Sequence, residues 1–268
     1  MKWILLLFTH FCGQAFALEA SDVFTFADSF TCNDRFPHHS YCEAVEFKSW
    51  RPEERELVSE YLKAMRGPRF EKLLAVIKDK GITKFHRVSY ASSWSANHAL
   101  RRVQFTRRHD KVLLWVNSVT RMVGFTDAFF KGTKFIDPRA ALPRKQLNVI
   151  HEIMHIFDLA ADDPSQSAAF QKAIGWKWDG HNHIVETIPF ARATEQFKEI
   201  MVYLDNGNAA RTYELDRELG VSYGVPTLYS LSNIRESFAE TLTYALLDPT
   251  AGEYLSTETL DYVDKLLK

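Results

Sequence analysis

The sequence contains few cysteines, almost no net charge and no long apolar run. Its 268 residues include three cysteines and carry a formal net charge of −1. A charge so close to zero argues against a nucleic-acid-binding protein, which would need a strongly basic face. The paired arginines Arg101–Arg102 and Arg107–Arg108 are therefore interpreted as solvated positions at a hairpin edge rather than as a phosphate-binding surface.

The apolar run at the N-terminus is too short to span a membrane. It begins at Trp3, and His10 and Gln14 interrupt it well before the roughly 20 residues that a spanning helix needs. The A-x-A pattern that ends at Ala17 fits a signal-peptidase site, so residues 1–17 are predicted to be a signal peptide. A buried N-terminal helix is the alternative. The mature protein is expected to be exported, to the periplasm or the exterior, without stable membrane insertion.

Removal of this leader would leave an even pair of cysteines, Cys32 and Cys42. The segment between them is polar and contains a proline, which is typical of a loop. A disulfide that closes this loop suits an oxidising compartment and agrees with export. Two free thiols are the alternative.

No internal repeat, low-complexity tract or obvious linker divides the chain. Apolar stripes with helical spacing predict packing helices over 51–67 and 68–81. Strand-like runs follow at 82–90, 100–106 and 111–119. From Leu142 onward the pattern is almost entirely helical. This order predicts an α+β fold, in which a small mixed sheet precedes a mainly helical half.

The segment NVIHEIMHIFD places two histidines one helical turn apart. Positions i and i+4 differ by about 40° around a helix, so His151 and His155 point the same way, with Glu152 beside them. Two converging imidazoles can bind zinc, and the carboxylate can take a proton from the water that attacks a carbonyl group. The spacing therefore predicts an H-E-x-x-H metal site with Glu152 as the general base. Two core histidines that bind backbone carbonyls are the alternative.

Catalytic zinc needs a third protein ligand, and none follows His155 in the short H-x-x-G-x-x-H spacing. The strongly helical segment 233–247 places Glu236 and Glu240 four residues apart on one face. Glu236 could instead close a capping box that begins at Asn233. That alternative leaves Glu240 without a role on a largely apolar helix. A ligand, Glu236, and a carboxylate that supports a ligand from behind, Glu240, explain both residues.

These segments resemble the gluzincin zinc peptidases, specifically the group that contains the peptidase domain of anthrax lethal factor and the Pro-Pro endopeptidases. The resemblance covers residues 142–248 and rests on HEIMHIFD and YSLSNIRESFAE. It implies that Asp158, three residues after the second histidine, orients the histidines together with Glu240. It also implies that Tyr229, seven residues before Glu236, donates a hydrogen bond to the oxyanion. A packing role for the tyrosine is the alternative.

The resemblance implies a zincin-like metallopeptidase fold over residues 82–268. Residues 18–81 then form an N-terminal segment with the disulfide loop and the packing helices. One departure from the family is the spacing, because the 81 residues from His155 to Glu236 exceed what the family leads us to expect. The additional chain contains two predicted helices, at 189–206 and 210–220.

The start of this longer segment, GWKWDGHNH, carries further residues with possible chemistry. His181 and His183 could bind a metal, but a polar loop flanked by glycines is the simpler interpretation. Trp176 and Trp178 are either core residues or a platform for substrate. The sequence does not decide between these two roles.

The sequence thus predicts an exported zinc endopeptidase that acts on peptides or proteins and holds one Zn²⁺ per chain. The strand at 111–119 is the candidate edge for pairing with an extended substrate. The alternative is a zinc-stabilised binding or toxin-like module on the same fold without peptidase activity. Glu152 favours the enzyme, because a purely structural metal site has no need of a base.

Overall fold

The computed structural model describes residues 18–29, 45–81, 83–90, 114–117, 122–131, 135–178, 183–185, 209–231 and 233–268. Several predicted features lie outside these residues: the signal peptide, the Cys32–Cys42 bridge, both arginine pairs, the strand at 100–106, His181 and the helix at 189–206. They remain predictions. Among the helices described, none combines the length and the apolar character that a membrane crossing requires.

The sheet is mixed and is built around one long strand, β3 (Thr83–Tyr90). The first half of β3 pairs in parallel with β1 (Phe24–Ala27), and its second half pairs antiparallel with β2 (Val45–Lys48). On the other side β3 pairs in parallel with β5 (Met122–Phe125), which pairs antiparallel with β4 (Leu114–Asn117). Of the predicted strands, those at 82–90 and 111–119 are therefore confirmed where they are described. β4 is an edge strand among the described strands.

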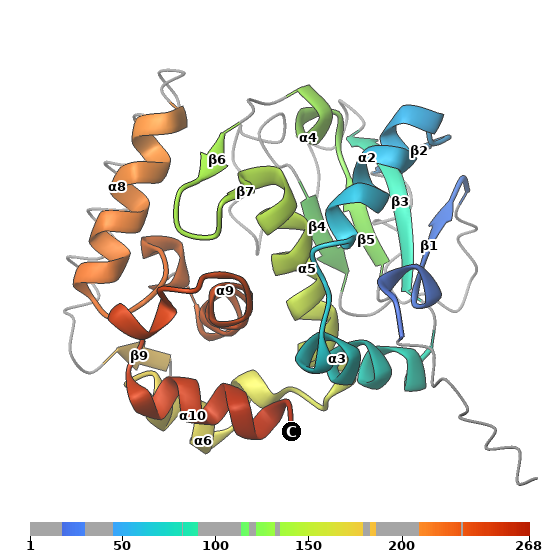
Figure 1. Cartoon of the computed structure of the whole chain (residues 1–268). Helices are drawn as coiled ribbons and strands as arrows, with labels where there is room; N and C mark the ends of the chain where they lie inside the picture. The colour runs from blue at the N-terminus through green and yellow to red at the C-terminus, as the bar shows by residue number, and fades with distance from the viewer. Residues whose placement is uncertain are drawn as a thin grey trace, which may run out of the picture.

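Helix α5 (Arg144–Ala160) connects this sheet to the helical half of the chain. It contacts β4, α2 (Pro52–Leu62) and α3 (Pro68–Asp79), and it packs most extensively on α9 (Ile234–Leu247). Helix α8 (Ala209–Ser222) lies beyond α9 as seen from α5 (Figure 1). The predicted α+β class is confirmed. Two small hairpins and several short helices complete the described fold: α4 (Asp127–Lys131), β6 (Ile136–Asp137), β7 (Leu142–Pro143), α6 (Ala168–Ala173), β8 (Trp176–Trp178), β9 (His183–Val185) and α10 (Thr257–Leu266).

The core under the sheet is rich in aromatic side chains. Phe85 of β3 is fully buried and stacks on Phe24 of β1 with ring centroids 5.0 Å apart. Trp50, which precedes α2, packs its ring on Phe125 of β5 and donates its indole N–H to the Phe85 carbonyl at 3.1 Å. The segment before residue 82 therefore contributes two strands and core aromatics as well as the two predicted helices. β1 and β2 were not predicted, because each has only four residues, which is too short for an alternating pattern to be distinguished from chance.

A buried arginine joins three of these elements. Arg87 of β3 donates through Nε to Glu54 of α2 at 3.1 Å and pairs through Nη2 with Asp127 of α4. Both Arg87 and Glu54 are almost fully buried. Burial acts to raise the pKa of Glu54, but hydrogen bonds from Arg51 and Arg87 outweigh it and lower the pKa below 4.5.

Arg87→Met should therefore lower the free energy of unfolding by about 3 kcal/mol, because it leaves a buried carboxylate with fewer partners. Arg55→Met is the matched control: its ion pair with Asp28 is solvent-exposed, and its loss should cost less than about 1 kcal/mol. Urea unfolding at pH 7 measures both. Because the pKa of Glu54 is lower in the folded state, its contribution is present above pH 4.5 and is lost as the pH falls further. Equal effects of the two variants at pH 7 would contradict the assignment.

Candidate metal centre

The two predicted histidines lie on the face of α5 that meets α9. α5 begins after Pro143, and buried apolar residues surround its polar stripe. α9 begins after Asn233, whose side-chain oxygen accepts hydrogen bonds from the backbone N–H groups of Arg235 and Glu236 at 3.0 and 3.1 Å. The side chain of Glu236 extends toward α5. The capping interaction expected of Asn233 is thus present, and the carboxylate of Glu236 is available for another partner.

Three possible ligand atoms converge between the two helices. Glu236 Oε2 lies 2.9 Å from His151 Nε2 and 3.1 Å from His155 Nε2, and the two Nε2 atoms are 3.1 Å apart. Tetrahedral zinc with bonds near 2.0–2.1 Å separates its ligand atoms by about 3.3 Å. The donor set of two imidazoles and one carboxylate fits zinc after only a small outward shift. Among the described residues, this is the group that could hold a metal ion.

Glu240 supports this cluster from behind, one turn further along α9. Its Oε1 lies 2.9 Å from His151 Nδ1, the ring nitrogen that points away from the other ligand atoms. Its Oε2 accepts a hydrogen bond from the Thr227 hydroxyl at 2.7 Å. A carboxylate on the far nitrogen fixes the orientation of a ligating imidazole and increases its basicity. Glu240 thus lies where the expected role would place it, and the role itself stays a prediction.

The cluster concentrates negative charge. Burial alone would lower the pKa of His151, but the carboxylates of Glu236 and Glu240 raise it to about 10. The pKa of Glu236 is correspondingly held well below its usual range by His151 and His155, against the opposing effect of burial. A third carboxylate, Glu152, is half-buried beside them. Several carboxylates around two imidazoles provide an environment that favours a cation.

Glu152 and Tyr229 flank the three ligand atoms. Burial raises the pKa of Glu152, while the neighbouring histidines act to lower it. The ring of Tyr229 lies 6.0 Å from that of His151, centroid to centroid. Burial raises the pKa of the Tyr229 phenol well above 10, and the charges of Glu236 and Glu152 add to this increase. The phenol is thus neutral and can donate a hydrogen bond.

Asp158 has different partners from those expected. This fully buried carboxylate accepts hydrogen bonds from the Ser165 N–H and hydroxyl groups at 2.8 and 2.7 Å. Its Oδ2 also pairs with Arg235 Nη1 at 2.9 Å, and the same nitrogen reaches Asp163 at 2.6 Å. These contacts connect the end of α5 to the residue before Glu236. Asp158 therefore bears on the position of the α9 carboxylate rather than on a histidine ring.

Several residues that hold the cluster were not predicted from the sequence. Thr227 binds Glu240, Asp216 of α8 accepts the backbone N–H of Tyr229 at 3.0 Å, and Arg235 binds Asp158. Arg144 Nη2 lies 4.0 Å from Glu240. The sequence contains no signal for Asp216, because it lies in the charged run Glu214–Glu218, which is typical of a solvated helix face.

The structure assigns one of the two tryptophans, Trp176 and Trp178, to the core. Trp176, in β8, is 4% exposed and belongs to the hydrophobic core. A core role is therefore the correct interpretation for this residue. The side chains of Trp178 and His183 lie outside what the structure describes, so their predictions stay open.

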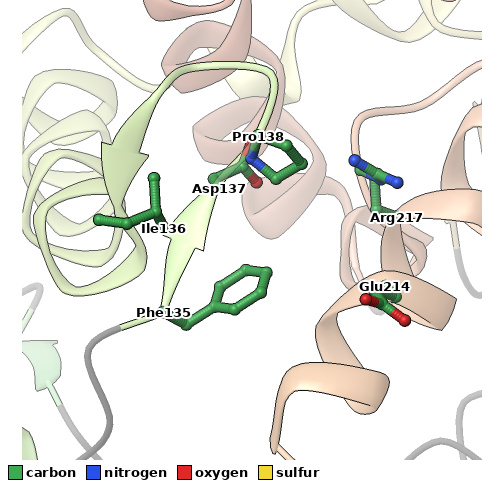
Figure 2. A pocket seen from close by; sticks show the side chains of 6 residues that line it. All are labelled: Phe135, Ile136, Asp137, Pro138, Glu214 and Arg217. Atoms are coloured by element: carbon green, nitrogen blue, oxygen red, sulfur yellow. The ribbon is translucent and has the colours of Figure 1, made fainter.

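An open pocket of about 230 Å³ lies between β6 and α8. Figure 2 shows Phe135, Ile136 and Pro138 on one side, with Glu214 and Arg217 of α8 opposite. None of the three residues of the metal cluster lines it. Asp137, on the pocket wall, accepts a hydrogen bond from the Tyr244 hydroxyl at 3.0 Å, and Arg144 donates to the same hydroxyl at 2.6 Å. The pocket is therefore separate from the metal cluster. Its wall residue Asp137 is connected to the cluster through Tyr244 and Arg144, which lies 4.0 Å from Glu240.

No protein-family model matches the chain, and no curated protein matches it. A solved structure, that of the PRO-PRO endopeptidase (PPEP-2) from Paenibacillus alvei, is similar over 92% of this chain and 98% of its own length. The sequence identity is 12% and the TM-score is 0.39. A likeness at this level does not place the chain in a family.

Proposed function

We propose that the protein is a zinc-dependent endopeptidase of the gluzincin type with a zincin-like fold, exported after removal of residues 1–17. The observation that carries this proposal is the convergence of His151, His155 and Glu236 from two helices, with Glu152 beside them. When bound, zinc would supply a Lewis acid for the peptide carbonyl and for the attacking water. Two imidazoles and one carboxylate are a typical ligand set for zinc that retains an open position for chemistry.

The side chains around the cluster have distinct roles in this proposal. Glu152 takes the proton of the attacking water, and its raised pKa brings its basicity closer to what a general base needs near neutral pH. Tyr229 donates its hydroxyl to the carbonyl oxygen as negative charge develops there. Glu240 holds His151 in one orientation through Nδ1, and Asp158 acts through Arg235 on the first turn of α9.

A metal-stabilised binding module would share the ligands but would have no need of Glu152. Keeping a carboxylate half-buried in a cluster that already holds Glu236 and Glu240 is unfavourable, because like charges repel and burial disfavours the ionised form. That cost favours a catalytic site. The edge strand β4 is the candidate for pairing with an extended peptide. Digestion of an unbiased peptide library by the zinc-loaded protein tests the proposal. If no peptide is cleaved, the endopeptidase assignment fails.

His155→Ala should abolish stable zinc binding, because the two remaining ligands hold the ion weakly. The wild-type protein should contain one zinc per chain by elemental analysis after dialysis, and the variant should contain little. Circular dichroism of both metal-free proteins provides the control, since an unfolded variant would lose zinc for a different reason. Full zinc occupancy in a folded His155→Ala protein would remove this residue from the ligand set.

A further inference from the structure

Helix α8 lies against the turn that carries Tyr229. This turn, η6 (Leu228–Leu231), contacts α8 on one side and α9 on the other. In Figure 1, α9 lies between α5 and α8. α8 belongs to the segment between His155 and Glu236, which is longer than the family resemblance leads us to expect.

Asp216 attaches α8 to the backbone of this turn. Its carboxylate is 7% exposed, and its Oδ1 accepts the N–H of Tyr229 at 3.0 Å. Burial raises the pKa of Asp216 to about 7; positive charge from Arg144 opposes this increase and negative charge from Glu240 adds to it. A buried carboxylate is costly, and a simple packing position would be filled by an apolar residue at less cost. Its hydrogen bond to Tyr229 therefore indicates a role in placing that residue.

Gly220 brings the two backbones into contact. A Cβ atom at this position would lie 2.4 Å from the Cα and carbonyl carbon of Thr227, closer than real side chains approach. The Gly220 carbonyl also accepts the N–H of Val225 at 3.0 Å. Gly220 lies one helical turn after Asp216. At this point α8 is in direct contact with the start of the loop formed by residues 225–231, which includes η6.

The loop of residues 225–231 reaches the metal cluster through two of its side chains. Thr227 donates its hydroxyl to Glu240, which lies against His151 Nδ1. Two residues later, Tyr229 places its ring beside that of His151. A change in how α8 holds the loop would therefore alter both groups together.

We propose that α8 is the positioning element of the site, and that Asp216 is a positioning residue which fixes the Tyr229 hydroxyl relative to the metal ligands. This inference rests on the proposed function, in which Tyr229 donates to the oxyanion. Misplacement of a catalytic group by about 1 Å reduces rates roughly a hundredfold. Loss of the Asp216 bond is expected to act on kcat rather than KM, because the hydroxyl interacts most strongly as charge develops in the transition state.

The test compares Asp216→Ala, Asp216→Asn and Glu218→Ala. Alanine removes the acceptor, asparagine keeps a carbonyl acceptor of the same size, and Glu218 is an exposed residue on the same helix that serves as the control. Peptide hydrolysis gives kcat and KM. NMR of protein labelled with ¹³C in the tyrosine rings gives a second measurement that needs no activity, with the Tyr229 signal assigned by its loss in Tyr229→Phe.

Asp216→Ala should lower kcat roughly ten- to a hundredfold at nearly constant KM and shift the Tyr229 signal, with zinc content unchanged. Asp216→Asn should recover most of the wild-type kcat and most of the wild-type position of the Tyr229 signal. Glu218→Ala should match the wild type in both measurements. A wild-type kcat and an unmoved Tyr229 signal in folded Asp216→Ala would overturn the inference. If the wild type cleaves no peptide, the proposed function fails, while a shifted Tyr229 signal in Asp216→Ala still supports the positioning role.

Discussion

Glu152→Gln should retain zinc and lose peptide hydrolysis. The amide has nearly the same size as the carboxylate but cannot accept the proton of the attacking water, so kcat should fall roughly 10²- to 10⁴-fold. Glu152 is not among the three residues whose ligand atoms converge, so the zinc content should match that of the wild type. Elemental analysis and cleavage of a peptide selected from a library measure the two quantities on the same preparation.

Glu236→Gln is the matched comparison for this variant. It makes the same chemical change at a residue whose Oε2 lies within 3.1 Å of both histidines, so it should weaken zinc binding as well as hydrolysis. The comparison of the two variants thus distinguishes the proposed base, Glu152, from the proposed ligand, Glu236. Wild-type turnover by Glu152→Gln would show that the mechanism is wrong. Loss of zinc from Glu152→Gln would instead assign that residue to the ligand set.

Tyr229→Phe should also be folded, zinc-loaded and slow. The substitution keeps the ring that lies near His151 and removes only the hydroxyl, which is the proposed donor for the developing oxyanion. Loss of one such donor lowers kcat by about ten- to a thousandfold. KM should change little, because the donor acts mainly on the transition state. Steady-state kinetics on a fluorogenic peptide, together with the melting temperature, provide the measurement.

Tyr262→Phe is the control for loss of a tyrosine hydroxyl. The Tyr262 hydroxyl contacts the Pro164 carbonyl at 3.3 Å and has no part in the metal cluster. Its removal should leave hydrolysis within a few-fold of the wild type. If Tyr229→Phe behaves in the same way, the tyrosine is a packing residue and another donor has to be sought.

Local patterns in the sequence predicted much of the site. The i, i+4 spacing of His151 and His155 depends only on helix geometry, and the two residues lie together as expected. Glu236 could be selected because Glu240, on the same apolar helix face, needed a partner, and the structure places Glu240 against His151. Both features are readable from a single helix, because they depend only on its periodicity and on the cost of burying a polar side chain.

The remaining features depend on contacts between distant segments. Asp158 was expected beside a histidine, but it binds Ser165 and Arg235 because the chain turns back after α5, and a turn of this kind has no periodicity to detect. The pairing of β1 and β2 with β3 likewise arises from tertiary packing of short strands. The sequence likewise did not predict the close contact between Gly220 and Thr227, because it arises from tertiary packing and not from a local pattern.

The ion pairs of Arg235 allow the chain between α5 and α9 to vary in length without moving the metal ligands. They join the end of α5, through Asp158, to the first turn of α9, and Asn233 caps that turn. The segment between these two helices contains α6, β8, β9 and α8 and is held at both ends. Closing a flexible loop of twice the length costs only about 0.6 kcal/mol more in entropy. Insertions in the connections between these elements, away from α8, can thus accumulate at little thermodynamic cost, while His155 Nε2 and Glu236 Oε2, from residues 81 positions apart, remain 3.1 Å from each other.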